Sequence, residues 1–187
     1  VCNMMLVISF ATMASDYVRF YIEEQATRDP LTGALNRRAF FKAIEMEFSR
    51  SQRHGHSFCV AMLDIDHFKN INDRFGHLVG DRVLTTMCKR VEGLVRPHDV
   101  FARYGGEEFL IMMPETALSN ATQVAQRLLE ELAVSDDAAL PAITVSIGMA
   151  EWSTGDDSLE SLIARADSAL YVAKKNGRNC IEIATAS

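Results

Sequence analysis

The sequence predicts an α+β fold in which helices and short strands alternate along the chain. Several long stretches carry apolar residues at the period of an amphipathic helix, and short, dense apolar runs lie between them. Two of the short runs flank Gly105-Gly106, which is a strong signal for an antiparallel hairpin. Because a parallel doubly wound sheet lacks such a hairpin, the α+β class fits better.

Composition and charge place the chain among globular proteins and argue against one class of partner. The 187 residues are 48% hydrophobic and 24% charged, which suits one domain with a short extension. The formal net charge of −6 argues against a nucleic-acid partner, which would favour a basic face. The four cysteines are scattered without zinc-ligand spacing, so we expect reduced thiols in a cytoplasmic protein; they are Cys2, Cys59, Cys88 and Cys180.

Residues 1–28 are predicted to form an N-terminal helix and linker ahead of a domain at 29–187. Residues 1–14 are almost entirely apolar, but a membrane-spanning helix needs about 20 such residues. Two interpretations stay open. The segment is either the end of a transmembrane helix, with Arg19 on the inner side, or a helix that packs on the domain or on a partner copy. We favour the membrane remnant.

The elements of the domain follow from apolar periodicity and from residues that interrupt it. Asp29-Pro30 ends the linker because the residue before proline is pushed out of helical geometry. Asn176-Gly177 suits a left-handed cap at the end of a helix. The expected helices are at 36–53, 76–95, 120–133 and 158–175, and the expected strands at 58–65, 100–104, 107–113, 143–150 and near 180–184.

Acidic residues occur where a buried strand ends and where the hairpin turns. Asp64 ends the strand at 58–65, and a carboxylate there is costly to bury unless a cation pairs with it. Glu107 and Glu108 directly follow the two glycines. Mg²⁺ prefers oxygen ligands and usually takes one or two carboxylates plus substrate phosphates, so the pattern fits a metal site for phosphoryl chemistry. Solvated turn residues are the alternative interpretation of the hairpin acids.

Polar residues after Asp64 favour the metal interpretation because they offer groups that bind a nucleotide. Lys69 is near enough in sequence to reach a triphosphate bound at Asp64, and His77 and Asp81 share one helix face. The amide of Asn72 and the carboxylate of Asp81 match the donors and acceptors on a guanine edge. Taken singly, each of these residues also fits a cap or a turn.

Five segments, in order, resemble a known family. They read DPLTGALNRR, DIDHFKNINDRFGHLVGDRVL, RYGGEEF, VSIGMA and ADSALYVAKKNGRN. Together they resemble the GGDEF family of bacterial diguanylate cyclases over residues 29–183. The resemblance implies a palm-like domain similar to nucleotidyl cyclases, with a mostly antiparallel central sheet flanked by helices and preceded here by the N-terminal helix. It also implies condensation of two GTP molecules into cyclic di-GMP and two pyrophosphates.

The resemblance implies roles for individual residues. Asp64 and Glu107 would ligate Mg²⁺, or Mn²⁺ in its place, with the backbone carbonyl of Ile65 as a further ligand. Glu107 would also accept the 3′-hydroxyl proton, Glu108 matches the motif's second acid, and Lys69 would stabilise charge on the phosphates. The positions matched to substrate binding are Phe68, Lys69, Asn72, His77, Asp81, Leu84, Lys174 and Arg178.

The resemblance also implies a regulatory site, and the chain departs from the family pattern at one position. Arg96 and Asp99 match the family's RxxD site, so we expect cyclic di-GMP to bind there and inhibit the enzyme. Ala34 stands where the family commonly has leucine, which would weaken guanine packing by about 1–2 kcal/mol. A side chain at Gly105 or Gly106 would keep the hairpin backbone from approaching the nucleotide.

The reaction itself predicts a homodimer. Each nucleotide must supply a 3′-hydroxyl to the other, so two copies must face each other, and the N-terminal helices are the expected means of assembly. The domain would then lie in the cytoplasm, on the inner face of the bacterial cell membrane.

Other functions remain as alternatives. The main one is an inactive domain that senses GTP or cyclic di-GMP, followed by a mononucleotide cyclase and, least favoured, a structural scaffold. The intact acids beside Gly105-Gly106, together with Asp64 and Lys69, favour the enzyme.

Overall fold

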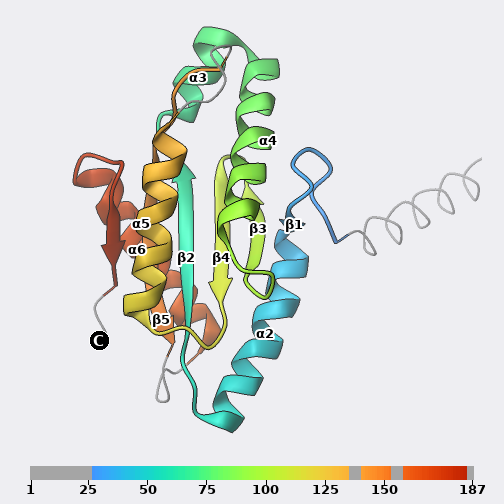
Figure 1. Ribbon diagram of the computed structural model, residues 1–187, viewed down its shortest axis with the longest axis vertical. Coiled ribbons are helices and arrows are strands. Elements are labelled where there is room, and N and C mark those ends of the chain that lie inside the picture. Colours follow the sequence, from blue (N-terminus) through green and yellow to red (C-terminus); the bar gives the residue numbers. More distant parts are fainter. Residues whose placement is uncertain (1–26, 135–139, 153–157, 185–187) are drawn as a thin grey trace, which may run out of the picture.

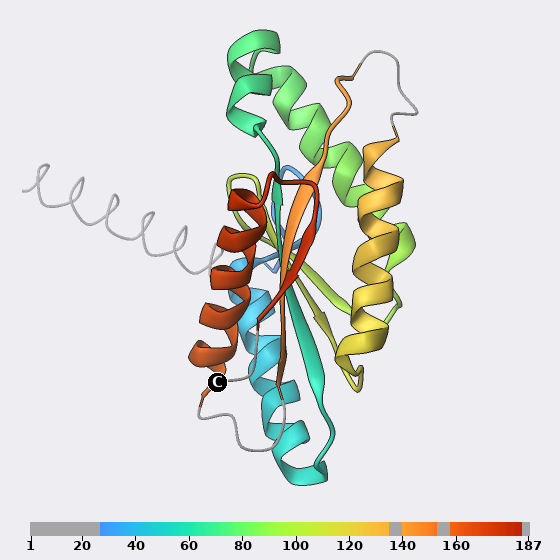
Figure 2. The same ribbon diagram turned by 90° about the vertical axis from the view of Figure 1, so that its left-hand side faces the viewer.

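A computed structural model describes residues 27–134, 140–152 and 158–184 as a six-stranded sheet with helices on both faces (Figures 1 and 2). Its elements are β1 (Leu35–Asn36), α2 (Arg37–His54), β2 (Phe58–Ile65), α3 (Phe68–Phe75), α4 (His77–Leu94), β3 (Val100–Gly105), β4 (Glu108–Met113), α5 (Leu118–Ala133), β5 (Val145–Trp152), α6 (Leu159–Lys175) and β6 (Ile181–Ile183).

The strand order is β1-β3-β4-β2-β5-β6, and the sheet is mixed. The two outer pairings, β1 with β3 and β5 with β6, are parallel. The three inner pairings are antiparallel. The prediction of an α+β domain with a mostly antiparallel central sheet is therefore confirmed.

The central strand β2 is buried along its whole length and separates two hydrophobic layers. Ala61 and Leu63 belong to the layer under α4 and α5, whereas Val60 and Met62 belong to the layer under α2 and α6 (Figure 2). Successive side chains of a strand point to opposite faces of a sheet. Asp64 is in phase with Val60 and Met62, so it lies on the face that α6 covers.

The main helices begin and end within two residues of the predicted positions, because apolar periodicity marks all four and side-chain caps mark α2 and α6. The side chains of Asn36 and Ser158 cap the first turns of α2 and α6. Gly55, with φ of 71°, ends α2. The helix α3 was not predicted from the sequence. It has only eight residues, so few apolar positions repeat along it and the local signal is weak.

The turn of the hairpin between β3 and β4 lies one residue later than predicted. Gly105 belongs to β3 and pairs with Glu108, so the two turn residues are Gly106 and Glu107 rather than Gly105 and Gly106. The register shifts between Arg103 and Gly105, because an extra residue forms a bulge there. Glu107 consequently lies in the turn itself and not in a strand.

The predicted N-terminal helix and its membrane interpretation concern residues 1–26, which lie outside the described residues. Within the described part of the chain, none of the helices combines the length and hydrophobicity that a bilayer crossing requires. At the start of the described part, Arg28 forms an isolated antiparallel bridge with Leu35.

Candidate active site

A row of polar residues crosses one end of the sheet on the face that α6 covers. Asp64 of β2 lies opposite Glu108 of β4 on one side and Ser146 of β5 on the other. Glu108 is in phase with Leu110, which packs in the layer under α2 and α6. Lys174, in the last turn of α6, reaches the row, and its Nζ lies 2.8 Å from Oδ2 of Asp64.

Asp64 and Glu107 form the acidic part of this site. Asp64 is buried, and the backbone carbonyl of Glu107 accepts a 3.3 Å hydrogen bond from the amide of Ile65. Burial raises the pKa of the Asp64 carboxyl, although Lys174 opposes the shift. Burial also raises the pKa of Glu107, and the negative charge of Asp64 raises it further. The two acids are therefore close enough to repel each other, and a cation would relieve that repulsion.

The donor set fits a hard divalent cation. The carboxylates of Asp64 and Glu107 and the carbonyl of Ile65 supply oxygen only, which suits Mg²⁺ or Mn²⁺. The Lys174 ammonium already supplies positive charge beside Asp64. No three His, Cys, Asp or Glu side chains of the described residues are grouped as an all-protein metal site. A metal that takes part of its coordination from substrate phosphates would need no such group.

Glu108 begins β4, directly after the turn that holds Glu107. It lines a small cavity of about 280 Å³ beside α6, together with Asp167, Tyr171 and Lys174. The two hairpin acids are thus not equivalent. Glu107 lies in the turn next to Ile65, and Glu108 lies in the row under α6.

The residues predicted to bind guanine lie on α3 and α4, which pack against each other, and α3 lies beyond the end of β2 (Figure 1). His77 and Asp81 are exposed on α4, and Asn72 of α3 is partly buried. Gly80 makes room for Asn72, because a Cβ at Gly80 would lie 2.0 Å from Oδ1 of Asn72. The structure therefore brings Asn72 next to the helix that carries Asp81.

Two predicted substrate contacts, by contrast, are buried in the core. Leu84 of α4 is 2% exposed and packs into the hydrophobic layer between α4 and the sheet. Phe68, at the start of α3, is buried in the same layer. Ala34 is 1% exposed and belongs to the same hydrophobic layer. The expected effect of Ala34 on guanine binding stays a prediction.

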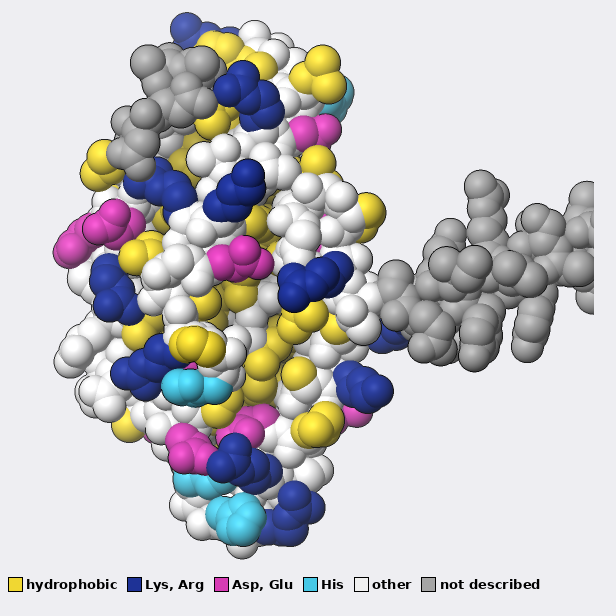
Figure 3. Space-filling view, turned by 45° about the vertical axis from the view of Figure 1, so that its right-hand side comes forward, with side chains coloured by type: hydrophobic (Ala, Val, Ile, Leu, Met, Phe, Trp, Pro, Cys, Tyr) yellow, Lys and Arg dark blue, Asp and Glu magenta, His cyan; other side chains and the backbone are white. Residues whose placement is uncertain are grey.

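The cations predicted to hold the triphosphate come from two places. Lys69 is exposed in the first turn of α3, a helix whose N-terminal amides have no side-chain cap. Lys174 and Arg178 lie at the end of α6, where Arg178 is exposed. On the face that Figure 3 shows, lysines and arginines are interspersed with acidic and apolar side chains. The three cations named above therefore come from the start of α3 and the end of α6.

Asp66 has no role that its sequence context predicts. It is buried just after β2 and accepts hydrogen bonds from Thr144, Ser146 and the backbone of Asn179. The only local signal was a second acid two residues after Asp64. Its partners lie far along the chain, so the sequence pattern does not reveal them.

Arg96 and Asp99 lie at the opposite end of the β3–β4 hairpin from the acids. Oδ2 of Asp99 accepts a 2.8 Å hydrogen bond from the Arg96 amide, and the Asp99 amide donates to the Arg96 carbonyl at 3.0 Å. Oδ1 of Asp99 is buried without a hydrogen-bond partner among the described residues. The pair therefore forms a closed turn with one unsatisfied acceptor.

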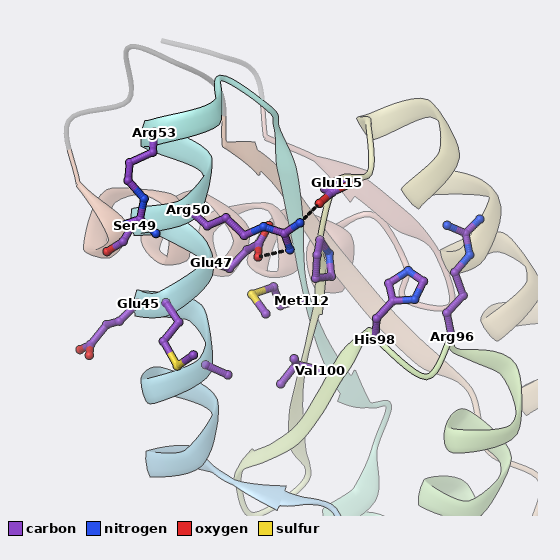
Figure 4. Close-up of a pocket in the computed structure, with 13 residues that line it drawn as sticks. Glu45, Glu47, Ser49, Arg50, Arg53, Arg96, His98, Val100, Met112 and Glu115 are labelled. Atoms are coloured by element: carbon purple, nitrogen blue, oxygen red, sulfur yellow. Dashed lines mark hydrogen bonds and ion pairs between the residues drawn. The ribbon is translucent and has the colours of Figure 1, made fainter.

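Arg96 also lines a groove of about 1030 Å³ between α2 and the strands β3 and β4. Figure 4 shows α2 as one wall and Arg96 with His98 as the other, while Arg50 extends from α2 to an ion pair with Glu115. Met112 of β4 lines this groove and lies four residues along the strand from Glu108, which at about 3.3 Å per residue places the two about 13 Å apart.

The sequence model of one family, described as "Diguanylate cyclase, GGDEF domain", matches residues 26–180. This chain belongs to the GGDEF-domain family. The GGDEF domain is 41% identical over 169 residues to the diguanylate cyclase DgcP of Pseudomonas aeruginosa, which covers 86% of this chain and 24% of that protein. It is 38% identical over 158 residues to the diguanylate cyclase DgcM of Escherichia coli, which covers 84% of this chain and 38% of that protein. The chain thus spans well under half of either relative.

A solved structure gives the same fold. The crystal structure of the coiled coil and GGDEF domain of DgcB from Caulobacter crescentus, in complex with c-di-GMP, is similar to this GGDEF domain with a TM-score of 0.80. The sequence identity is 33%, and the alignment covers 97% of this chain and 99% of that one.

Proposed function

We propose that this GGDEF domain is a diguanylate cyclase that condenses two GTP molecules into cyclic di-GMP and two pyrophosphates. The observation that supports this most directly is the meeting of Asp64, Glu107 and Lys174 at one end of the sheet. Two relatives at 41% and 38% identity are named diguanylate cyclases, which supports the same activity.

Asp64, Glu107 and the Ile65 carbonyl would hold Mg²⁺, or Mn²⁺ in its place. When bound, the metal supplies positive charge that neutralises the triphosphate and the charge that develops during phosphoryl transfer. Glu108 would support the site from the neighbouring strand.

The remaining residues would bind and orient GTP. Lys174 and Arg178 would hold the triphosphate from the end of α6, and Lys69 with the first amides of α3 would hold it from the other side. Asn72 and Asp81 would recognise the guanine edge, with His77 nearby. Phe68 and Leu84 would support this pocket from the core beneath α3 and α4, because both are buried there.

In each half of the reaction, the 3′-oxygen of one GTP bonds to the α-phosphorus of the other. The bond from that phosphorus to pyrophosphate breaks, and the 3′-hydroxyl proton leaves to a base. Glu107 would accept this proton. A bound cation would lower the pKa that burial and the charge of Asp64 raise, so this role rests on the place of Glu107 in the turn beside Ile65 and not on its basicity.

The active form would be a homodimer, because one site that holds one GTP cannot supply both partners. Residues 1–28 would assemble the dimer and would also attach the protein to the inner face of the bacterial cell membrane. The DgcB structure is named for a coiled coil as well as a GGDEF domain, and its alignment extends over 97% of this chain, which supports assembly through the N-terminal segment.

Cyclic di-GMP would act as inhibitor as well as product, through Arg96 and Asp99. The exposed Arg96 guanidinium can stack on guanine and donate a pair of hydrogen bonds to it. The adjoining groove has room for a dinucleotide, at about 1030 Å³. Asp99 would take part from the same turn, where its Oδ2 accepts the hydrogen bond of the Arg96 amide.

Incubation of the chain with GTP and Mg²⁺, followed by mass analysis of the nucleotides, tests the proposed activity. We expect cyclic di-GMP and pyrophosphate, and neither from the Glu107→Gln variant or from samples with EDTA. Unchanged GTP would favour a sensing module. A monomeric cyclic nucleotide would favour a mononucleotide cyclase.

A further inference from the structure

Asp66 is a buried carboxylate that the proposed reaction does not use. It is 5% exposed. Its Oδ1 accepts a 2.6 Å hydrogen bond from Oγ of Ser146, and its Oδ2 accepts from Oγ1 of Thr144 at 2.7 Å and from the amide of Asn179 at 3.0 Å. One side chain thus joins the end of β2, the start of β5 and the turn that follows α6.

The turn after α6 has an unfavourable backbone conformation. Gly177, Arg178 and Asn179 have φ of 106°, 67° and 47°, so two residues with a Cβ lie in the left-handed region in succession. Such a conformation persists only where the surroundings hold it. The Arg178 amide donates to the Ala173 carbonyl at 3.1 Å, which ties the turn to α6.

The rest of the turn is held from the sheet. The carbonyl of Cys180 accepts a 3.0 Å hydrogen bond from the amide of Ile147 in β5. Between these two anchors, the Asn179 amide is directed at Asp66. Because Asp66 is itself fixed by Thr144 and Ser146, it connects the turn to the rigid centre of the sheet.

We infer that Asp66 is a positioning residue that holds the turn after α6 so that Arg178 and Lys174 lie where the triphosphate of GTP binds. The inference rests on the proposed function for the identity of the ligand. Lys174 lies in the last turn of α6 and Arg178 in the turn itself, so the anchor acts on both cations at once.

A carboxylate suits this position because all three partners are donors. Asparagine can keep the same contacts, since its amide nitrogen can face Ser146, whose hydroxyl is able to accept. Alanine would leave the Asn179 amide without a partner, and glutamate would keep the charge but displace the oxygens. These three substitutions therefore separate hydrogen bonding from charge.

The test compares binding of 3′-deoxy-GTP and 3′-deoxy-GMP to the full chain by calorimetry with Mg²⁺. Neither compound has the attacking hydroxyl, so no condensation occurs. The ratio of the two dissociation constants measures the contribution of the triphosphate tail. We expect Asp66→Ala and Asp66→Glu to reduce this preference about tenfold and to change 3′-deoxy-GMP binding less than about twofold, whereas Asp66→Asn should reduce the preference less than about threefold.

Glu47→Ala is the matched control. Glu47 is another buried carboxylate, 7% exposed, and it pairs with His56 at 3.1 Å in the corner between α2 and β2. Loss of this acid should lower thermal stability and leave the triphosphate preference unchanged.

Three outcomes would overturn the inference. The first is an unchanged preference for 3′-deoxy-GTP over 3′-deoxy-GMP in both Asp66→Ala and Asp66→Glu. The second is an equal loss of this preference in Asp66→Ala and Asp66→Asn. The third is an equal weakening of the binding of both compounds. If Asp66→Ala does not fold, Asp66→Glu carries the test. A wild-type chain that prefers 3′-deoxy-GTP but makes no cyclic di-GMP from GTP would refute the cyclase proposal and leave this inference standing.

Discussion

The Nζ atom of Lys174 lies 2.8 Å from Oδ2 of Asp64 and joins the last turn of α6 to the end of β2. This contact depends on close packing of α6 against the sheet. A Cβ at Gly148 of β5 would lie only 2.1 Å from the Leu170 amide and 2.2 Å from the Ala166 carbonyl. Glycine at position 148 therefore lets α6 approach closely enough for its lysine to reach the acid.

Replacement of Lys174 by methionine should strengthen the binding of a metal ion and weaken the binding of GTP. Asp64 loses its cationic partner, so the nucleotide-free chain should bind Mn²⁺ more tightly. The triphosphate loses a cation, so GTP should bind about tenfold more weakly. Paramagnetic resonance of free Mn²⁺ and a GTP titration measure the two effects.

Lys175→Met is the control for this prediction. Its Nζ lies 4.4 Å from the centre of the Tyr171 ring and not beside Asp64, so neither affinity should change appreciably. Weaker Mn²⁺ binding in Lys174→Met would contradict the prediction.

The raised pKa values of Asp64 and Glu107 predict how stability depends on pH. A raised pKa means that the fold favours the protonated acid, so each acid's contribution to stability is full at low pH and is lost as pH rises through the raised pKa. Asp64→Asn should therefore raise the melting temperature of the metal-free chain at pH 7 by about 2–4 °C, and the gain should disappear in acid.

Thermal unfolding in EDTA at neutral and acidic pH measures this effect. Mn²⁺ should stabilise the wild-type chain at neutral pH and less so in acid, because the ligands must be deprotonated. A lower melting temperature for Asp64→Asn at pH 7 would show that burial of the charge is not destabilising.

Gly80→Ala should disturb guanine recognition by displacing Asn72. The added Cβ would lie 2.0 Å from Oδ1 of Asn72 and 3.2 Å from Cζ of Phe68. We expect KM for GTP to rise about tenfold, with a smaller change in kcat. Gly93→Ala, in the same helix, meets nothing within 4 Å and should instead stabilise the chain by about 0.5–1 kcal/mol. Equal kinetics for both variants would refute the displacement.

Arg96→Ala should relieve product inhibition and leave turnover intact. Arg96 lines the groove at the far end of the hairpin from the acids, so its loss removes a guanine contact there without touching the site at Asp64. Initial rates with added cyclic di-GMP should show an inhibition constant raised about tenfold. Inhibition as strong as in the wild type would exclude this inhibitory site.

The activity should depend on protein concentration. Because two sites must face each other, velocity per subunit should rise with concentration until the dimer is fully formed. Light scattering at the same concentrations reports the assembly. A constant velocity per subunit in a sample that is monomeric throughout would rule out the requirement for two copies.

Much of the site was predictable because its signals are local. The end of a buried strand at Asp64 and the acids after Gly105-Gly106 are visible in short stretches of sequence, and so are the caps that begin α2 and α6. The shift of the hairpin turn by one residue was not visible, because the bulge depends on how β3 pairs with β4. The helix α3 also lacked a strong local signal, since its eight residues are too few for a clear apolar period.

The sequence by itself determined the fold class, the order of the longer elements and the types of residue available for chemistry, because periodicity, caps and turns act over a few neighbouring residues. It did not determine β1 or α3. Only the tertiary structure decided that Glu108, Asp64 and Ser146 form one row under α6 and that Lys174 reaches it. The anchoring of Asn179 by Asp66 likewise depends on strands and a helix that are distant in sequence. Register between strands and close packing of a helix arise from contacts between such distant segments, and no local pattern encodes them.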